Sequence, residues 1–230
     1  MKIITDEKLI ARNAKIGKYT GFISLLVLGG GFYLSIKNQE QIWYSLVALI
    51  VGFVLSQTSM YFVNRWGRSP RPDEVLDAAL KGLDDRYSLY HYSSPTAHLL
   101  VGPAGVCVLL PYYHTGKITY NESKGSWKRK GGNLYMRFFA QDSIGRPDRD
   151  IVFETEAVKN ALGKIPDFEV PLIQAILVFT SKSAIVEVEN APSPTLHALK
   201  LKKFINKEAK GSDALSMTDV RTIQDSLERA

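Results

Sequence analysis

The sequence predicts an α/β domain that follows a hairpin of two transmembrane helices. Two long uncharged stretches, 19–36 and 42–63, lie in the first third of the chain. Beyond residue 72, helical and strand patterns alternate, which is typical of an α/β domain with a mixed sheet. The mean hydropathy of −0.07 is an average over these two unlike parts.

The two uncharged stretches have the length and composition of membrane spans. About 20 helical residues cross a hydrocarbon core of roughly 30 Å. Neither stretch shows the polar stripe, every three to four residues, of an amphipathic helix in a soluble protein. The first stretch begins too late for a signal peptide and lacks a clear cleavage site. We therefore expect two membrane-spanning helices within 19–66.

The connection between the two spans is short, so we expect them to form an antiparallel hairpin. It holds one Lys and one Glu, Lys37 and Glu40. The run Gly29-Gly30-Gly31 in the first span would let two backbones approach closely, and we expect it to face the second helix.

Basic residues flank the hairpin on both outer sides. They are Lys2, Lys8, Arg12, Lys15 and Lys18 before it, and Arg65, Arg68 and Arg71 after it. The positive-inside rule then places both ends at the cytoplasmic face. The expected organisation is a basic cytoplasmic N-terminus (1–18), the hairpin (19–66), a linker (67–72) and an α/β domain (73–230) of a cell-membrane protein.

The α/β domain begins with a helix that opens at Asp73 and Glu74. Apolar runs predict strands, and the spacing of apolar residues predicts further helices. We expect strands at 87–92, 98–101, 106–110, 117–120, around 127, and at 134–139, 173–179 and 184–188, with helices at about 150–164, 198–207 and 218–229. Gly131-Gly132 would join the strands around 127 and 134–139 as a hairpin.

The net charge indicates the kind of partner, and the single cysteine is a candidate nucleophile to be weighed. The net charge of +6, from 29 basic and 23 acidic residues, favours anionic neighbours such as lipid headgroups or nucleic acid. The single cysteine, Cys107, lies in an apolar strand, where a buried thiol is inert packing.

One basic cluster is the candidate nucleic-acid or anion-binding site. It comprises Lys117, Lys124, Lys128, Arg129 and Lys130. Trp127 among them would allow a base to stack. A second basic stretch holds Lys200, Lys202, Lys203, Lys207 and Lys210. Both sets are equally compatible with a lipid-facing or solvated surface.

The segment 97–118 resembles the core of the nuclease-related domain (NERD) family. The match rests on Gly102-Pro103-Ala104-Gly105-Val106 between two aliphatic runs, preceded by His98 and followed by Gly116-Lys117-Ile118. The resemblance extends from about Glu74 to the C-terminal helix and implies a restriction endonuclease-like fold.

The catalytic positions of the family are replaced in this chain. The family has an acidic residue at the position of Ala97, a glutamate at Leu110 and a lysine at Tyr112. The implied chemistry needs two carboxylates on a divalent metal and a lysine beside the reacting groups. Alanine and leucine do not bind Mg²⁺, and tyrosine is neutral at pH 7.

Catalysis by relocated residues is the alternative. The candidates are Glu74, Asp150, Glu154, Glu156 and Lys159, each of which also suits a solvated helix face. His98 and His114 flank the strand turn and are candidates for phosphate contact. No nucleotide-binding loop and no Cys/His metal spacing occurs in the sequence.

The resulting hypothesis is a membrane-anchored, catalytically inactive nuclease-like domain that acts as a binding or scaffolding module, with the lipid bilayer as a partner. We expect no cofactor and no metal. The alternatives are a metal-dependent nuclease with relocated residues and a structural subunit of a larger membrane complex. Nucleic acid and other membrane proteins are the further candidate partners.

Overall fold

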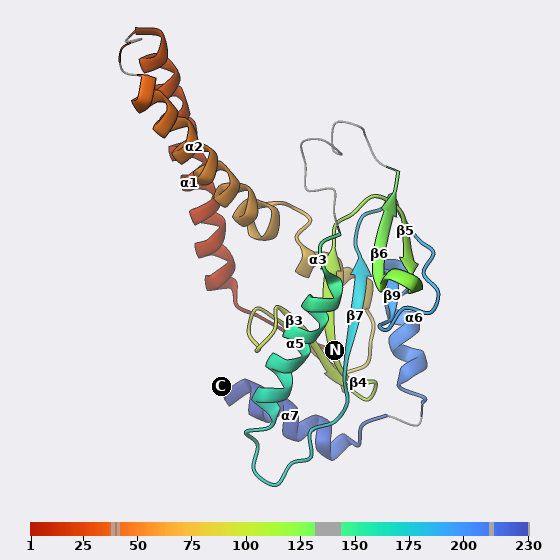
Figure 1. The fold of residues 1–230 in the computed structure, drawn as a ribbon. Coiled ribbons are helices and arrows are strands. Elements are labelled where there is room, and N and C mark those ends of the chain that lie inside the picture. Colours follow the sequence, from red (N-terminus) through yellow and green to blue (C-terminus); the bar gives the residue numbers. More distant parts are fainter. Residues whose placement is uncertain (38–39, 41, 132–143, 212–213, 230) are drawn as a thin grey trace. The chain divides into compact units, whose positions relative to one another are not determined.

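The computed structural model of the chain describes residues 1–37, 40, 42–131, 144–211 and 214–229. It divides into two compact units (Figure 1). One is a helical hairpin, Asp6–Arg71. The other is an α/β unit formed by Met1–Thr5 together with Pro72–Ala230.

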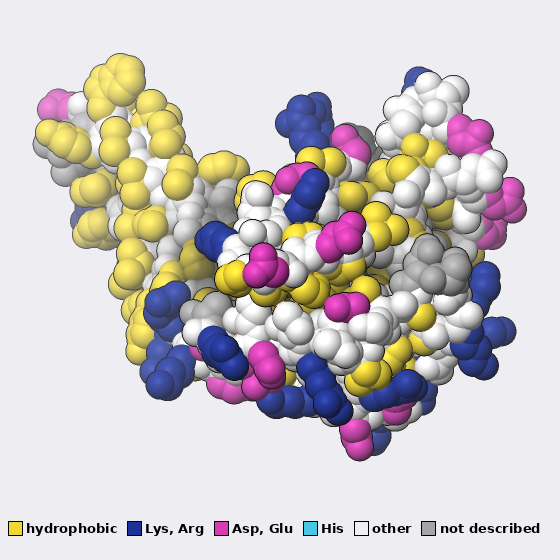
Figure 2. Space-filling view, turned by 90° about the horizontal axis from the view of Figure 1, so that it is seen from below, with side chains coloured by type: hydrophobic (Ala, Val, Ile, Leu, Met, Phe, Trp, Pro, Cys, Tyr) yellow, Lys and Arg dark blue, Asp and Glu magenta, His cyan; other side chains and the backbone are white. Residues whose placement is uncertain are grey.

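The hairpin consists of α1 (Glu7–Lys37), α2 (Ile42–Phe62) and a short π-helical turn, η2 (Val63–Gly67). Both long helices are apolar and long enough to cross a membrane. The expected span 19–36 lies within α1, and α2 follows the expected span 42–63 to within one residue. Large apolar side chains cover the outside of the hairpin, the yellow arm at the left of Figure 2.

Small residues let α1 and α2 pack closely. Ser24 Oγ of α1 donates a hydrogen bond of 2.8 Å to the carbonyl oxygen of Gly52, and Ser59 Oγ of α2 donates one of 2.7 Å to that of Gly17. A Cβ atom at Gly52 would lie 2.5 Å from Leu28 Cγ. The backbone approach at Gly52 therefore depends on the absence of a side chain.

The glycine run of α1 is divided between two faces. A Cβ at Gly31 would lie 2.6 Å from Ala48 Cβ, so Gly31 faces α2 as expected. At Gly29 and Gly30 an added Cβ meets no atom within 4 Å. The expectation that all three glycines mark the contact with α2 is therefore wrong for Gly29 and Gly30, because consecutive helical residues point about 100° apart.

The α/β unit contains two sheets. The large sheet has the strand order β1-β2-β3-β4-β7-β9 and the small sheet has the order β6-β5-β8. The strands are β1 (Lys2–Thr5), β2 (Ser88–His91), β3 (His98–Gly102), β4 (Gly105–Tyr112), β5 (Gly116–Asn121), β6 (Ser126–Lys130), β7 (Ile173–Phe179), β8 (Ala184–Val186) and β9 (Thr195–His197). Because β2, β3 and β4 are antiparallel neighbours while β4, β7 and β9 run parallel, the sheet is mixed, as the sequence predicts.

Helices cover both faces of the large sheet. They are α3 (Pro72–Leu80), α5 (Pro147–Leu162), α6 (Ala198–Glu208) and α7 (Met217–Arg229), with a 3-10 turn, η3 (Glu122–Lys124), between β5 and β6. Alternate residues of β4 belong to two different cores because successive strand residues point to opposite faces. Val108 packs in the core beneath α5 and α7, whereas Leu109 packs in the core beneath α3 and α6.

The N-terminal residues form a strand of the α/β unit. Strand β1 pairs in parallel with β2, with Ile4 opposite Tyr90, and Ile4 packs against the core while Ile3 is 46% exposed. The expected basic N-terminus 1–18 is therefore not a separate segment, since it consists of β1 and the first turns of α1. The expected domain range 73–230 also omits this strand.

Most expected strands and helices of the domain occur within a few residues of their predicted bounds. The strand around Trp127 is β6, and it pairs with β5. The expected strand 134–139 lies outside the described residues. Two short strands, β1 and β9, are not among the expected elements.

Candidate functional site

The three replaced positions of the family motif lie at one end of the β3–β4 pair. Leu99 is opposite Val108 in this antiparallel pair, so the same register places Ala97, just before β3, opposite Leu110. Tyr112 is the last residue of β4 and follows Leu110 on the same face. The backbone therefore brings the three positions together, but their side chains include no carboxylate and no cation.

Helix α5 brings two carboxylates to the same end of the sheet. Tyr112 Oη donates a hydrogen bond of 2.7 Å to Asp150 Oδ2. Thr96, which precedes Ala97, donates its hydroxyl to Glu154. Asp150 and Glu154 are four residues apart and so share one face of α5.

Tyr112 is held in its neutral form. Burial raises the pKa of its hydroxyl, and the hydrogen bond to Asp150 and the negative charge of that carboxylate raise this pKa further. A neutral tyrosine donates one hydrogen bond and carries no charge. It therefore does not replace a lysine that would stabilise negative charge on phosphate.

The cluster offers two carboxylates to a metal ion. Among the residues that the structure describes, no group of three or more His, Cys, Asp or Glu side chains is placed to hold a metal ion. Asp150 and Glu154 each accept a hydrogen bond from a neutral side chain. These two hydrogen bonds tie α5 to the sheet.

The remaining acidic and basic candidates do not join this cluster. Glu156 and Lys159 are exposed on α5. Lys159 follows Glu154 by five residues, which places it about 140° away around the helix. Glu74 lies in the first turn of α3, on the opposite side of the large sheet from α5. The structure therefore unites only Asp150 and Glu154 of the candidate set.

The two histidine candidates lie in packed side-chain clusters. His98 is buried, and its Nδ1 is 2.8 Å from Nδ1 of His91, whose Nε2 is 3.0 Å from Asp77 Oδ1. The ring of His114 packs beside those of Tyr112 and Phe179, which stack on each other. Neither placement favours a phosphate contact, because both rings are engaged within the fold.

Cys107 is an inert core residue, as expected. It is fully buried, and burial raises the pKa of its thiol to about 12. A thiol in this state carries almost no thiolate at neutral pH and is a poor nucleophile.

The five residues of the basic cluster are spread over the small sheet. Lys117, Lys128 and Lys130 share its exposed face, since Lys117 is opposite Lys130 and alternate residues point the same way. Lys117 forms an ion pair with Glu187. Arg129 points to the other face, where its guanidinium donates to Thr115. Lys124 lies in η3.

Trp127 is unavailable for base stacking. Its side chain is 7% exposed and packs in the core, and its indole Nε1 donates to Thr195 Oγ1 at 3.1 Å. The expected combination of cations with an accessible aromatic ring is therefore wrong. The residue alternates inward along β6, between the outward Ser126 and Lys128.

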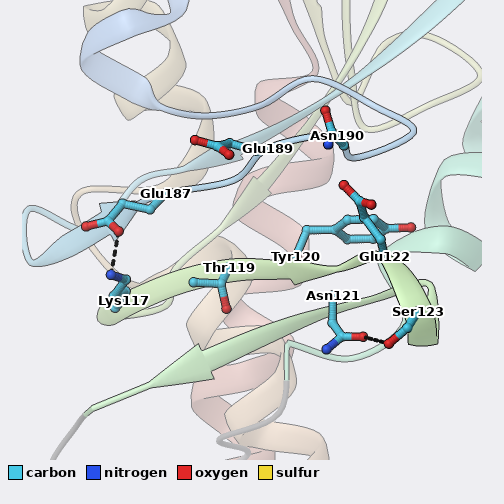
Figure 3. Close-up of a pocket in the computed structure, with 9 residues that line it drawn as sticks. All are labelled: Lys117, Thr119, Tyr120, Asn121, Glu122, Ser123, Glu187, Glu189 and Asn190. Atoms are coloured by element: carbon cyan, nitrogen blue, oxygen red, sulfur yellow. Dashed lines mark hydrogen bonds and ion pairs between the residues drawn. The ribbon is translucent and has the colours of Figure 1, made fainter.

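The groove beside the basic cluster is predominantly acidic (Figure 3). Carboxylates of Glu122, Glu187 and Glu189 line it, and the ammonium group of Lys117 is the cation among its lining side chains. An anionic ligand would meet three carboxylates beside one paired lysine. The groove itself therefore disfavours an anionic ligand, whereas Lys124, Lys128 and Lys130 lie outside its lining.

Comparisons with known proteins add no assignment to this geometry. No protein-family model matches the chain, no curated protein matches it, and no solved structure matches it. The structure itself establishes a mixed α/β unit and two long apolar helices near the N-terminus. The relationship to restriction endonuclease-like proteins stays a prediction.

Proposed function

We propose that the chain is a membrane-anchored, catalytically inactive nuclease-like domain that acts as a binding or scaffolding module at the cytoplasmic face. One observation carries the proposal. At the end of the sheet where the NERD family has its metal-binding carboxylates, this chain has Ala97 and Leu110. Tyr112, at the position of the family's lysine, is hydrogen-bonded to Asp150. Fold resemblance alone transfers no activity when the reacting groups are missing.

The surface of the hairpin supports membrane anchoring. Phe22, Leu25, Phe32, Ile50 and Phe53 are each more than half exposed. In water this surface would be a large apolar patch, whereas the hydrocarbon core of a bilayer solvates it. The contacts between the helices use small residues and serine hydroxyls, as is common for helices in membranes.

The chain connectivity supports a placement of both outer ends of the hairpin on the same side of the bilayer. Strand β1 ends at Thr5, α1 begins at Glu7, and the chain returns to the same α/β unit at Pro72. Both outer ends of an antiparallel hairpin lie on the same side of a bilayer. The excess of Lys and Arg at these ends supports the cytoplasmic side.

Membrane extraction and protease protection test the anchor. We expect the full chain to stay in the membrane pellet after alkaline carbonate washing. In inverted vesicles, added protease should digest the α/β unit, whereas right-side-out vesicles should protect it. Release by carbonate would instead show a peripheral or soluble protein.

The scaffolding role predicts a protein or lipid partner. Purification of the full chain in mild detergent would show whether other membrane proteins remain bound. A stable stoichiometric complex whose assembly needs the hairpin would favour the structural-subunit alternative. Retention of partners by the α/β surface would favour the binding module.

A nuclease with relocated residues is the second candidate. One observation favours it, because Asp150 and Glu154 reach the end of β4 where a metal would bind in the family. Two carboxylates held by hydroxyl donors would have to exchange those hydrogen bonds for metal ligation. Metal-dependent cleavage that requires Glu154 would establish this alternative.

A further inference from the structure

A stripe of three cations runs along the outward face of α1. Lys8, Arg12 and Lys15 are exposed and follow one another at intervals of four and three residues. At about 100° per residue these positions lie within about 60° of one another around the helix. We call this set the α1 basic stripe.

The α1 basic stripe lies opposite the buried side of the helix. Ile10, Asn13 and Gly17 are the buried residues of this part of α1. Their mean direction is about 170° from that of the stripe. Helical geometry therefore turns the three cations away from the packed side.

The cations of the stripe have no acidic partner among the residues that the structure describes. No ion pair or hydrogen bond joins the side chains of Lys8, Arg12 or Lys15 to another described residue. Glu7 is the sole acidic residue of α1, and it lies about 100° from Lys8 around the helix. The positive charge of the stripe is consequently left for an external anion.

Tyr19 continues the stripe at the start of the apolar part of α1. It follows Lys15 by four residues, lies on the same face and is 64% exposed. Tyrosine is enriched where hydrocarbon meets headgroups. With Tyr19 at that boundary, Lys15 lies about 6 Å and Arg12 about 10 Å farther along the axis, within reach of the headgroup layer. Lys8 lies about 16 Å beyond the boundary.

We infer that the α1 basic stripe binds the headgroups of anionic phospholipids. This inference rests on the proposed membrane anchoring and adds the lipid class to it. The ammonium and guanidinium groups complement phosphate and carboxylate, and the long side chains reach toward the interface. Lys15 and Arg12 contact headgroups directly, whereas Lys8 acts through its field over about a Debye length.

The geometry sets an order for the three residues. Each cation near an anionic surface adds about 1 kcal/mol, which corresponds to about fivefold in binding. The loss of lipid preference should be largest for Lys15→Gln, smaller for Arg12→Gln and smallest for Lys8→Gln. High salt should reduce the contribution of Lys8 first, because it acts at the longest range.

The test uses the full chain in bilayers of phosphatidylcholine with phosphatidylserine. Spin-labelled forms of the two lipids report their relative association with the protein. We expect a preference for phosphatidylserine that the triple variant K8Q/R12Q/K15Q reduces severalfold. The matched control is K200Q/K203Q/K207Q, which removes the same charge from the exposed face of α6 and should keep the preference.

The outcomes distinguish a failure of the lipid site from a failure of the membrane anchor. Carbonate extraction is measured first, so loss from the membrane would refute the anchor itself. Stable insertion with equal association of the two lipids would refute the lipid site alone. The same conclusion would follow if the α6 control lost as much of the phosphatidylserine preference as the stripe variant. If the protein in neutral bilayers bound duplex DNA and the stripe variant abolished this binding, the stripe would be assigned to nucleic acid instead.

Discussion

Tyr112 Oη donates a hydrogen bond of 2.7 Å to Asp150 Oδ2 and thereby joins the end of β4 to the first turn of α5. A double-mutant cycle of Tyr112→Phe and Asp150→Ala should give a coupling free energy of about 1 kcal/mol. Either single change already removes this hydrogen bond to a charged group near the surface, so the double variant loses it only once. Urea unfolding of the α/β unit in detergent measures it. Additive effects of the two changes would show that the bond contributes no stability.

Buried tyrosines make the α/β unit sensitive to alkali. Burial raises the pKa of Tyr90 to about 12, and burial likewise raises the pKa values of Tyr87 and Tyr112 above their ordinary value. The neutral hydroxyl is then favoured in the folded state. Its stabilising contribution is complete below about pH 10 and is lost as the pH rises toward the folded pKa.

We therefore expect the free energy of unfolding to fall between about pH 10 and pH 12. Each tyrosine contributes a slope of at most about 1.4 kcal/mol per pH unit. In Tyr90→Phe this slope should be shallower, since one titrating group is removed. Urea midpoints at pH 9, 10 and 11 measure the difference. An identical slope in the variant would contradict the role of Tyr90.

Adjacent glycines of α1 give a matched test of hairpin packing. Gly31→Ala should destabilise the hairpin by about 1–3 kcal/mol, because the new methyl group overlaps Ala48. Gly30→Ala makes the same chemical change where nothing lies within 4 Å. It should be neutral or stabilise by up to about 1 kcal/mol. Thermal unfolding of the full chain in detergent compares them, and equal midpoints would refute the observed helix register.

Strand β1 gives a second matched pair. Ile4→Ala removes apolar atoms that pack against the core and should cost about 1–3 kcal/mol. Ile3→Ala changes a residue that is 46% exposed and should cost less than about 1 kcal/mol. Hydrogen exchange of β2 measures the local effect. Equal protection in both variants would mean that β1 is not part of the sheet.

The sequence predicts the long elements well and misses two short strands. The apolar runs of α1, α2, β4 and β7 identify those elements because their side chains are buried or apolar over many residues. Strands β1 and β9 are too short to show a period. Their positions depend on pairing with β2 and β7, which are distant in the sequence.

The site shows the same division. Local sequence predicts that positions 97, 110 and 112 meet, because the tight turn of the β3–β4 pair fixes their register. It does not predict that Asp150 reaches Tyr112, since α5 begins 35 residues after β4 ends. The four-residue spacing of Asp150 and Glu154 was the available signal. The burial of Trp127 follows only from its packing in the core and its hydrogen bond to Thr195 of β9, which is far along the chain.

A nuclease assay on the full chain in detergent tests whether the α/β unit is catalytically inactive. The full chain is needed because a fragment that starts at Pro72 would lack β1. With single- and double-stranded DNA and RNA, and with Mg²⁺, Mn²⁺ or EDTA, we expect no cleavage. Metal-dependent cleavage that Glu154→Gln abolishes would contradict this expectation and show an active site rebuilt on α5. The control Glu156→Gln, a change on the exposed face of α5, should then leave the cleavage intact.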